Sequence, residues 1–346
     1  MRIVIVSDAW HPQVNGVVRT LSALIGELER AGRTVTTITP DLFRSIPCPT
    51  YPEIRLALFP GREVARLIEA NRPCAIHIAT EGPLGWAARR WCLRRGVPFT
   101  TAYHTRFPEY VQARFGLPLA LSYAVVRRFH APAAAVMVAT RTIEDALAAR
   151  GFVNLRRWSR GVDTDLFRPD RPAVYDPDLP RPIFLYVGRL AVEKNVQSFL
   201  SLDLPGSKVV VGEGPQAAAL RRRFPAALFV GPQRGEALAA HYADADVFVF
   251  PSRTDTFGLV LLEALACGVP VAAYPVPGPL DVIGAHPVGR LDEALGRAAI
   301  EALTIPRALC RAHAETFSWS ASAGQFLSNL APFDEAAAWA AQETPS

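Results

Sequence analysis

Long apolar runs are absent from this 346-residue sequence. No stretch reaches the roughly 18 consecutive apolar residues that a bilayer requires, so we expect no membrane-spanning helix. The first eight residues lack the apolar core and cleavage site of a secretory leader, and we interpret them as a first strand. A chain of this length favours two domains, each large enough to bury its own core.

Cysteine and lysine are scarce. The five cysteines are scattered without a Cys-x-x-Cys pair, which argues against structural zinc and indicates a reduced, cytosolic protein. Only two lysines, Lys194 and Lys208, occur beside 35 arginines. Because arginine supplies nearly every positive charge, Lys194 is a candidate for a position that needs a compact point charge. Lys208 weakens this argument, since it precedes a strand and has no evident role.

Charge is divided unevenly along the chain. Residues 1–168 contain 23 arginines and 13 acids, net +10, whereas residues 169–346 contain 14 basic and 19 acidic residues, net −5. A basic half is typical of a domain that meets an anionic surface; an arginine-rich composition without function is the alternative. The basic residues are dispersed and no nucleic-acid-binding motif occurs, so we expect no nucleic-acid partner.

Strand-like and helix-like segments alternate in both halves, which predicts an α/β fold with parallel sheets. The expected strands lie at 2–7, 34–39, 75–79, 99–103 and 134–139, then at 182–187, 208–211, 227–230, 246–250 and 270–274. Proline-rich residues 167–182 are interpreted as a linker. We therefore predict domains at 1–168 and 169–317, with a C-terminal helix at 318–334 joined to the first domain.

The first candidate site follows the first expected strand of the second half. Gly188 and Arg189 come directly after this strand, and Lys194 follows near the start of a helix. Ligands of open α/β sheets bind beyond the carboxyl ends of the strands. Two cations beside helix-end amides suit a diphosphate, so we predict that Arg189 and Lys194 contact one.

Two acids eight positions apart follow the fourth expected strand of that half. Asp255 lies in the loop, Gly258 opens the next helix and Glu263 falls inside it. A carboxylate accepts hydrogen bonds from both hydroxyls of a ribose, which suits Glu263, whereas Asp255 is placed for a transferred sugar. The backbone amides of Phe257, Gly258 and Leu259 are candidates for phosphate contacts. The alternative is two solvated surface acids.

Two loops of the first half carry further candidates. Gly16 opens the helix after the first expected strand, where a glycine lets the backbone approach a ligand closely. His104 follows the strand at 99–103 and is a candidate acid, base or polar contact, a purely structural histidine being the alternative. Its neighbours Tyr103 and Arg106 are candidates for the acceptor side.

Several weaker patterns remain. The turn containing Gly212 and Gly214 is neither a dinucleotide fingerprint nor a P-loop; it suits either a nucleobase pocket or a tight turn alone. Asp-x-Asp patterns begin at Asp163, Asp176 and Asp244, but none follows a strand, so we expect no metal ion and no cofactor. Residues 82–95 combine two tryptophans with four arginines, which indicates either an interfacial helix or an ordinary crossover helix.

Together these motifs resemble those of the retaining glycosyltransferases of family 4 (glycosyltransferase group 1). That family has the GT-B fold, in which two Rossmann-like domains face each other across a cleft. The matching segments lie at 15–17, 159–167, 188–195, 212–215 and 255–263, and they span nearly the whole chain. The resemblance implies that Arg189 and Lys194 hold the donor diphosphate and Glu263 the ribose. It also implies that Gly16 closes on the phosphate and that His104 lies near the transferred sugar.

One position departs from the family pattern: the first of its two paired glutamates is Asp255 here. In this respect the chain looks most like bacterial glycolipid synthases (diacylglycerol glycosyltransferases) and related alpha-mannosyltransferases. The resemblance implies retaining transfer of a hexose from a UDP- or GDP-linked sugar to a membrane lipid such as diacylglycerol. It places the protein in the cytoplasm, peripheral on the inner face of the plasma membrane. A soluble or polysaccharide acceptor, or a catalytically silent sugar-nucleotide-binding protein, remain alternatives.

Overall fold

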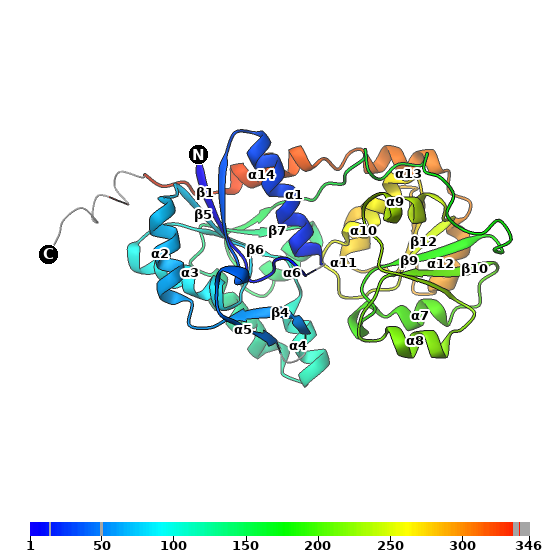
Figure 1. The fold of residues 1–346 in the computed structure, drawn as a ribbon, viewed down its shortest axis with the longest axis horizontal. Helices are drawn as coiled ribbons and strands as arrows, with labels where there is room; N and C mark the ends of the chain where they lie inside the picture. Colours follow the sequence, from blue (N-terminus) through cyan, green and yellow to red (C-terminus); the bar gives the residue numbers. More distant parts are fainter. Residues whose placement is uncertain (14, 49–50, 335–338, 340–346) are drawn as a thin grey trace. The chain divides into compact units, whose positions relative to one another are not determined.

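The computed structural model describes residues 1–13, 15–48, 51–334 and 339. The chain forms two compact units (Figure 1). Unit 1 consists of Met1–Ser159 and the C-terminal segment from Trp319, and unit 2 consists of Arg160–Ser318.

Unit 1 is built on a parallel six-stranded sheet with the order β2-β1-β5-β6-β7-β8. The strands are β1 (Arg2–Val6), β2 (Thr34–Ile38), β5 (Ala75–Ile78), β6 (Thr100–Tyr103), β7 (Ala135–Val138) and β8 (Leu155–Arg157). The helices are α1 (Gly16–Arg30), α2 (Gly61–Asn71), α3 (Pro83–Arg95), α4 (Phe107–Phe115), α5 (Leu119–His130), α6 (Arg141–Ala148) and α14 (Trp319–Asn329), with a short 3-10 turn η1 (Pro40–Leu42). An antiparallel pair, β3 (Ser45–Cys48) and β4 (Tyr51–Ala57), stands apart from this sheet.

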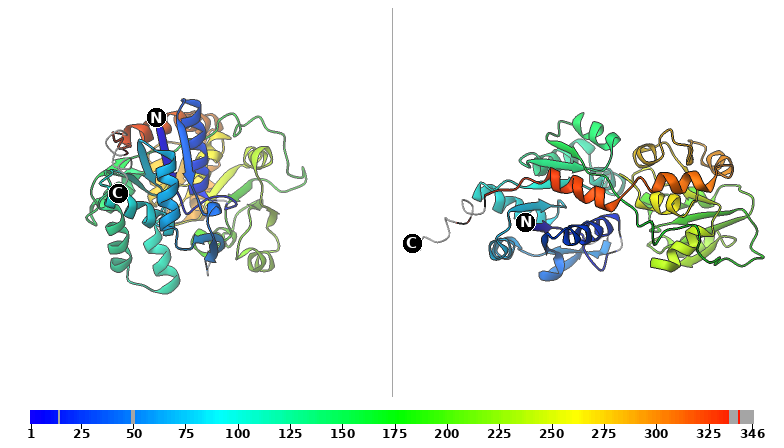
Figure 2. Two further views of the ribbon diagram at one scale, coloured as in Figure 1. Left: turned by 60° about the vertical axis from the view of Figure 1, so that its left-hand side comes forward. Right: turned by 90° about the horizontal axis from the view of Figure 1, so that it is seen from above.

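The central strand β1 is buried on both faces, because successive side chains point to opposite sides of a sheet. Ile3 and Ile5 pack in one layer with Leu24 of α1, whereas Val4 and Val6 pack in the other layer with residues of α2 and α3. Burying each such side chain contributes about 2 kcal/mol. The C-terminal helix α14 lies beside α1 in the first layer (Figure 2).

Unit 2 is built on a second parallel sheet with the order β11-β10-β9-β12-β13-β14. The strands are β9 (Ile183–Val187), β10 (Ser207–Val211), β11 (Leu228–Gly231), β12 (Val247–Phe250), β13 (Val271–Ala273) and β14 (Gly289–Leu291). The helices are α7 (Val196–Leu200), α8 (Ala217–Arg223), α9 (Gly235–Ala243), α10 (Leu259–Ala266), α11 (Pro277–Val282), α12 (Leu295–Ala302) and α13 (Arg307–Ala314), with a 3-10 turn η2 (Val192–Lys194). Within this unit, α7 and α8 lie on one side of the sheet and α9, α10 and α13 on the other (Figure 1).

The strand order of unit 2 fixes where a ligand is expected. The chain runs outward from β9 to β10 and β11, then returns to place β12 on the other side of β9. This reversal is a topological switch point, and open α/β sheets bind ligands beyond the carboxyl ends of the two strands that flank it. Those strands are β9 and β12, which precede the two motifs with the strongest sequence signal.

The division between the units falls after Ser159, whereas the sequence predicted a domain boundary after Arg168. The intervening residues are fastened to unit 2 by Arg311 of α13. Its Nη1 donates to the carbonyls of Thr164 and Phe167, at 3.0 and 2.8 Å. Within the described part of the chain, no helix is both long and apolar enough to cross a bilayer.

Candidate active site

The loops that follow β9 and β12 are bonded to each other. Ser252 Oγ and Thr254 Oγ1 each donate to the carbonyl of Glu193 across 3.4 Å. Asn195 Nδ2 donates to the carbonyl of Pro251 at 3.2 Å. The structure thereby brings together the two motifs that lie far apart in the sequence.

Lys194 and Asp255 form an ion pair at this edge of the sheet. Their side chains are 25% and 15% exposed, so the pair is accessible without being fully solvated. Asp255 Oδ1 carries the pair, and Oδ2 is buried without a hydrogen-bond partner among the described residues. A buried acceptor without a donor is costly, so Oδ2 is suited to a ligand hydroxyl.

Helix α10 begins directly beyond this pair. Gly258 precedes it with φ +83°, a left-handed conformation that favours glycine. Phe257 is buried, and α11 approaches it so closely that a Cβ on Gly278 would lie 2.6 Å from the Phe257 carbonyl oxygen. The predicted amide donors, Phe257 to Leu259, are therefore held at the N-terminus of α10 by rigid packing.

Glu263 occupies an environment that the sequence did not predict. It is only 3% exposed, and its Oε2 accepts a hydrogen bond from the hydroxyl of Tyr242 in α9 at 3.0 Å. A carboxylate on this helix was expected to be open to a ligand. Instead, the Glu263 carboxylate is buried between α9 and α10 and is bonded to Tyr242. No sequence motif includes this tyrosine.

The two glycines after β10 lie where backbone packs closely against backbone. A Cβ on Gly212 would lie 1.9 Å from the Gly188 carbonyl oxygen, and one on Gly214 would lie 2.6 Å from the Leu190 carbonyl oxygen. Leu190 N donates to the carbonyl of Glu213 at 2.9 Å. These contacts support the tight-turn interpretation of Gly212 and Gly214, and they position the loop that contains Arg189.

In unit 1, α1 begins at Gly16 after a side-chain cap. Asn15 Oδ1 accepts from the amides of Val17 and Val18, both at 3.0 Å. A Cβ on Gly16 would meet nothing within 4 Å. Among the described residues, therefore, no close neighbour requires glycine at this position, and its predicted phosphate contact stays a prediction.

His104 follows β6 as predicted, and its ring meets Trp158 edge-on with the ring centroids 5.6 Å apart. Tyr103 is 1% exposed and lies in the apolar cluster of α5 and α6. Burial raises its pKa above the usual tyrosine value, so it stays a neutral phenol. The structure thus gives Tyr103 a packing role, and its contribution to acceptor binding stays a prediction.

Arg106 is paired inside unit 1. Its Nε and Nη2 donate to Glu109 Oε1 at 3.0 and 2.6 Å, and the Tyr123 hydroxyl donates to the same oxygen at 2.7 Å. An acceptor that used Arg106 would have to share it with Glu109. The predicted acceptor role of Arg106 also remains a prediction.

Asp8 lies just after β1 and was not predicted as a site residue from the sequence. Its Oδ1 accepts from Leu84 N at 2.8 Å, and its Oδ2 accepts from Gly85 N and the Thr80 hydroxyl at 3.2 and 3.0 Å. Burial raises the pKa of Asp8 to about 6, although these three hydrogen bonds lower it. An acid directly after the first strand was the available signal, and Asp8 joins β1 to the start of α3.

The first aspartate of each Asp-x-Asp pattern accepts hydrogen bonds from backbone amides. Asp163 Oδ1 accepts from the amide of Asp165, and Asp176 Oδ1 from that of Asp178. Asp244 Oδ2 accepts from two linker amides, at 2.8 and 2.9 Å. No group of metal-ligating side chains gathers within the described ranges.

Burial raises the pKa of the Cys92, Cys267 and Cys310 thiols to about 12, which keeps them protonated.

The arginine- and tryptophan-rich segment at 82–95 forms the crossover helix α3. Trp91 is buried, and Trp86 packs edge-on against Phe129 of α5 with the ring centroids 5.1 Å apart. Arg89 donates to the carbonyls of Arg128 and Phe129, both at 2.9 Å. The tryptophans and Arg89 are thus used inside unit 1, which favours the crossover interpretation over the interfacial one.

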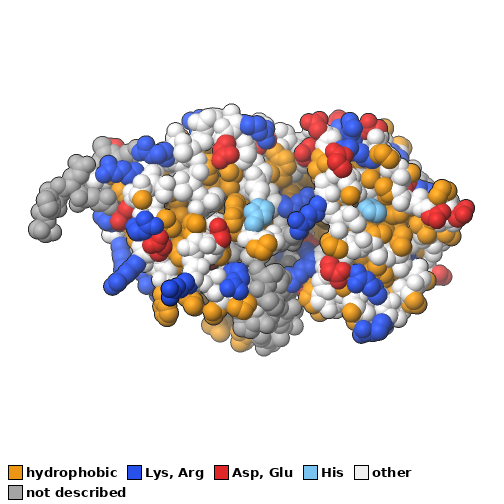
Figure 3. Space-filling model, viewed as in Figure 1, with side chains coloured by type: hydrophobic (Ala, Val, Ile, Leu, Met, Phe, Trp, Pro, Cys, Tyr) orange, Lys and Arg blue, Asp and Glu red, His pale blue; other side chains and the backbone are white. Residues whose placement is uncertain are grey.

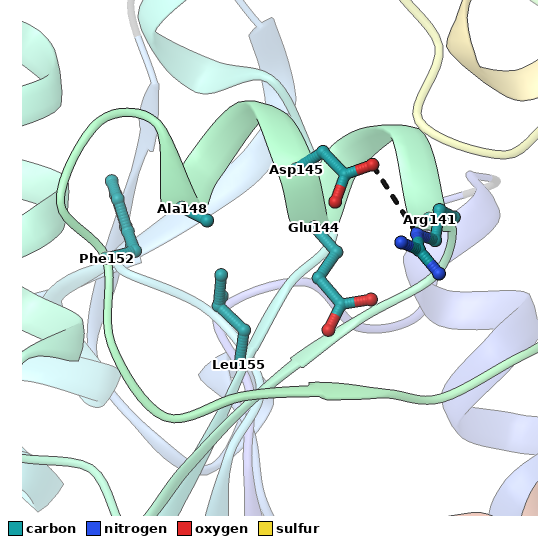
Figure 4. A pocket seen from close by; sticks show the side chains of 6 residues that line it. All are labelled: Arg141, Glu144, Asp145, Ala148, Phe152 and Leu155. Carbon is teal, nitrogen blue, oxygen red and sulfur yellow. Dashed lines mark ion pairs between the residues drawn. The ribbon is translucent and has the colours of Figure 1, made fainter.

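A cavity of about 370 Å³ lies between α6 and the segment leading into β8 (Figure 4). Its lining is Arg141, Glu144, Asp145, Ala148, Phe152 and Leu155. None of the residues predicted from sequence lines it. All six lining residues belong to unit 1.

The fold and this edge together define a class of protein. Unit 2 is an open α/β sheet whose switch point carries a lysine, a carboxylate and a glycine-preceded helix N-terminus. That combination is typical of sites for phosphorylated nucleotides.

Comparison with known proteins gives the family. Residues 14–166 match the family model described as Glycosyltransferase Family 4, and residues 181–304 match the one described as Glycosyl transferases group 1. A GDP-mannose-dependent alpha-mannosyltransferase of Mycobacterium tuberculosis is 33% identical over 318 residues, covering 84% of this chain and 83% of the relative. The chain belongs to glycosyltransferase family 4, as the sequence motifs predicted.

Two further relatives differ in their named activities. Sulfoquinovosyl transferase of Arabidopsis thaliana is 32% identical over 69% of this chain and 50% of its own. Alpha-monoglucosyldiacylglycerol synthase of Streptococcus pneumoniae is 27% identical over 88% of this chain and 78% of its own. The prediction of a glycosyltransferase of the hexosyltransferase type, with a nucleotide-sugar donor, is confirmed.

Solved structures confirm the fold. Sucrose-phosphate synthase of Thermosynechococcus elongatus has a TM-score of 0.72 at 22% identity, covering 94% of this chain and 97% of that one. An Anabaena protein in complex with UDP and glucose has a TM-score of 0.67 at 13% identity, covering 95% and 98%. The predicted fold class, α/β of the GT-B type with two Rossmann-like domains, is confirmed.

Proposed function

We propose that this enzyme transfers a hexose, with retention of configuration, from a nucleotide-diphosphate sugar to a membrane lipid such as diacylglycerol. The observation that carries the donor half of the proposal is the Lys194–Asp255 pair at the switch point of unit 2. When the donor binds, its diphosphate takes over part of the role of the Asp255 carboxylate as the negatively charged partner of Lys194. The same carboxylate then has an unpartnered oxygen for a hydroxyl of the sugar.

The chemistry assigned to these residues is stabilisation of the leaving group. Negative charge grows on the β-phosphate as the glycosidic bond breaks, and we assign its stabilisation to Lys194, Arg189 and the amides from Phe257 to Leu259. Preorganised charges of this kind reduce the need for a metal ion. Asp255 pairs with Lys194 and Glu263 accepts from Tyr242, so neither is placed as a free nucleophile, which is compatible with a front-face retaining mechanism.

For the donor, GDP-mannose is the first candidate. Two mycobacterial relatives and one from Corynebacterium glutamicum, at 33%, 33% and 30% identity, are named GDP-mannose-dependent alpha-mannosyltransferases. The Streptococcus pneumoniae relative, which is named for a diacylglycerol product, supports the lipid acceptor. UDP-linked hexoses remain the second group of donors.

For the acceptor surface, we propose the outer face of α5, on the basic unit 1. Leu121 and Val125, four residues apart, are 58% and 52% exposed, and Leu117 just before the helix is 44% exposed. The helix contains no acid, and Arg127 and Arg128 lie in its last turn. Exposed leucine and valine beside arginine suit an anionic bilayer, which supports a peripheral location on the inner face of the plasma membrane.

The basic side chains of unit 1 are otherwise dispersed, as the face in Figure 3 shows. Dispersed charge supports a weak, salt-sensitive attraction to a lipid surface.

The decisive experiment is a donor panel. Purified protein is incubated with GDP-mannose, UDP-glucose and related donors in the presence of bacterial lipid extract, and products are identified by mass and by anomeric configuration. A lipid product with the donor's configuration supports the proposal. Transfer only to soluble glycans supports the soluble-acceptor alternative. Donor binding without transfer or hydrolysis supports a catalytically silent protein.

A further inference from the structure

Tyr242 is a fully buried tyrosine whose hydroxyl bonds to the carboxylate proposed for ribose binding. The side chain is 0% exposed, and its hydroxyl donates to Glu263 Oε2 at 3.0 Å. Nothing in the sequence marks Tyr242, which lies near the end of α9. The hydrogen bond joins α9 to α10 at the one strongly buried acid on α10.

The ring of Tyr242 is positioned by neighbours that do not involve the hydroxyl. Its centroid lies 5.6 Å from that of Phe248 and 5.9 Å from that of Phe167. Phenylalanine would satisfy this apolar packing equally well. A buried hydroxyl costs free energy unless it is bonded, so the hydroxyl is explained by its acceptor, the Glu263 carboxylate.

The distance between donor and acceptor is fixed by α13. Arg307 donates to the carbonyls of Ala243 and Ala245 at the end of α9, at 2.6 and 2.8 Å. The same guanidinium donates to the carbonyl of Cys267 at the end of α10, at 3.2 Å. One side chain therefore ties the two helix ends together, and Tyr242 and Glu263 have little freedom to separate.

We propose that Tyr242 is a positioning residue for the donor nucleotide. Its hydroxyl fixes the rotation of the Glu263 carboxylate, so that the acceptor is already oriented when the ribose arrives and less ordering accompanies binding. This inference rests on the proposed role of Glu263. It predicts an effect on donor affinity, which is separable from the transfer step.

The test is Tyr242→Phe, with Tyr175→Phe as the matched control. Tyr175 is also buried and also packs on α9, but its hydroxyl donates to the carbonyl of His241 at 3.1 Å. In Tyr242→Phe we expect the KM for the donor to rise about tenfold, as for loss of one hydrogen bond to a charged group. The kcat should change by less than about twofold, and Tyr175→Phe should leave both values near wild type.

A second readout uses donors that lack the 2′- or 3′-hydroxyl of the ribose. Wild-type enzyme should discriminate against them, and Tyr242→Phe should discriminate less, because the ribose and the tyrosine act through the same carboxylate. Unchanged KM and unchanged discrimination in Tyr242→Phe would overturn the inference while leaving the glycosyltransferase proposal intact. An equal rise in KM in Tyr175→Phe would also overturn it, since the effect would then belong to general packing of α9.

Failure of the proposed function would give a different result from failure of the Tyr242 inference. In that case the wild-type enzyme would transfer sugar from no donor in the panel. If Tyr242→Phe does not fold, a crystal structure of the wild-type enzyme with GDP bound replaces the kinetic test. A ribose hydroxyl bonded to Glu263, with the Tyr242 bond retained, supports the inference. A Glu263 carboxylate turned away from the ribose contradicts it.

Discussion

At the scale of single residues, the buried acids Asp8 and Glu263 accept different sets of hydrogen bonds. Glu263 Oε2 accepts from the Tyr242 hydroxyl, whereas the two oxygens of Asp8 accept from two amides and a threonine hydroxyl. Gly82 comes so close to Asp8 that a Cβ there would lie 2.4 Å from its Cγ. Asp8 therefore occupies a rigid cage at the junction of β1 and α3.

The cage around Asp8 predicts a pH dependence of stability. Burial raises its folded-state pKa to about 6 from an ordinary 3.8. A raised folded pKa stabilises the protein below about pH 4, and this contribution is lost as the pH rises through about 6. The loss is on the order of 2–3 kcal/mol. Asp8→Asn cannot titrate, so its unfolding free energy should lack this fall between pH 4 and 6. Urea unfolding across that range checks it, and parallel pH profiles for wild type and variant would refute it.

At this scale, the sequence predicted functional residues that directly follow the end of a strand. Lys194 and Asp255 were both singled out, and the structure pairs them. Asp8 and Tyr242 were missed because their roles depend on partners about 20 to 77 residues away, and no local pattern encodes such partners. The burial of Glu263 was missed for the same reason.

At the scale of elements, most strands of the two sheets were predictable from the sequence, and some short elements were not. The expected strand of residues 99–103 corresponds to β6. Helices α4 and α11, of nine and six residues, have prolines in their first turns, and no helix was predicted for either segment. The edge strands β8 and β14 have three residues each, too few for a periodic pattern.

The close contact between the loops after β9 and β10 predicts the effect of adding one methyl group. Gly212→Ala places a Cβ 1.9 Å from the Gly188 carbonyl oxygen, at a residue with φ +141°. We expect a loss on the order of 2–4 kcal/mol in stability, together with weaker donor binding, because the Arg189 loop must move. Thermal unfolding and nucleotide titration measure both.

Gly61→Ala is the matched control for Gly212→Ala. It lies at the start of α2, where a Cβ would meet nothing within 4 Å. Its melting temperature should stay close to that of wild type. Equal tolerance of both substitutions would show that the two loops are not held as described.

At the scale of the whole molecule, the charge asymmetry predicts salt-sensitive attachment to anionic membranes. Wild-type protein should sediment with phosphatidylglycerol vesicles at low salt and be released as salt rises. Substituting both Leu121→Gln and Val125→Gln on α5 should weaken this binding severalfold without changing the melting temperature. Val174→Gln, an exposed valine of unit 2, should bind like wild type. Absence of low-salt binding by the wild type would contradict the membrane proposal.

The two lysines of the chain allow the most direct test of the central claim, that the switch point of unit 2 stabilises the leaving diphosphate. Lys208 Nζ donates to the carbonyls of Leu200 and Leu202, which is a structural role. Lys194 pairs with Asp255 at the predicted site. The measurement is donor turnover and melting temperature in Lys194→Ala and Lys208→Ala. We predict that Lys194→Ala lowers kcat about 100-fold or more and keeps its fold, whereas Lys208→Ala loses stability and keeps kcat. Near-normal turnover in Lys194→Ala would contradict the account.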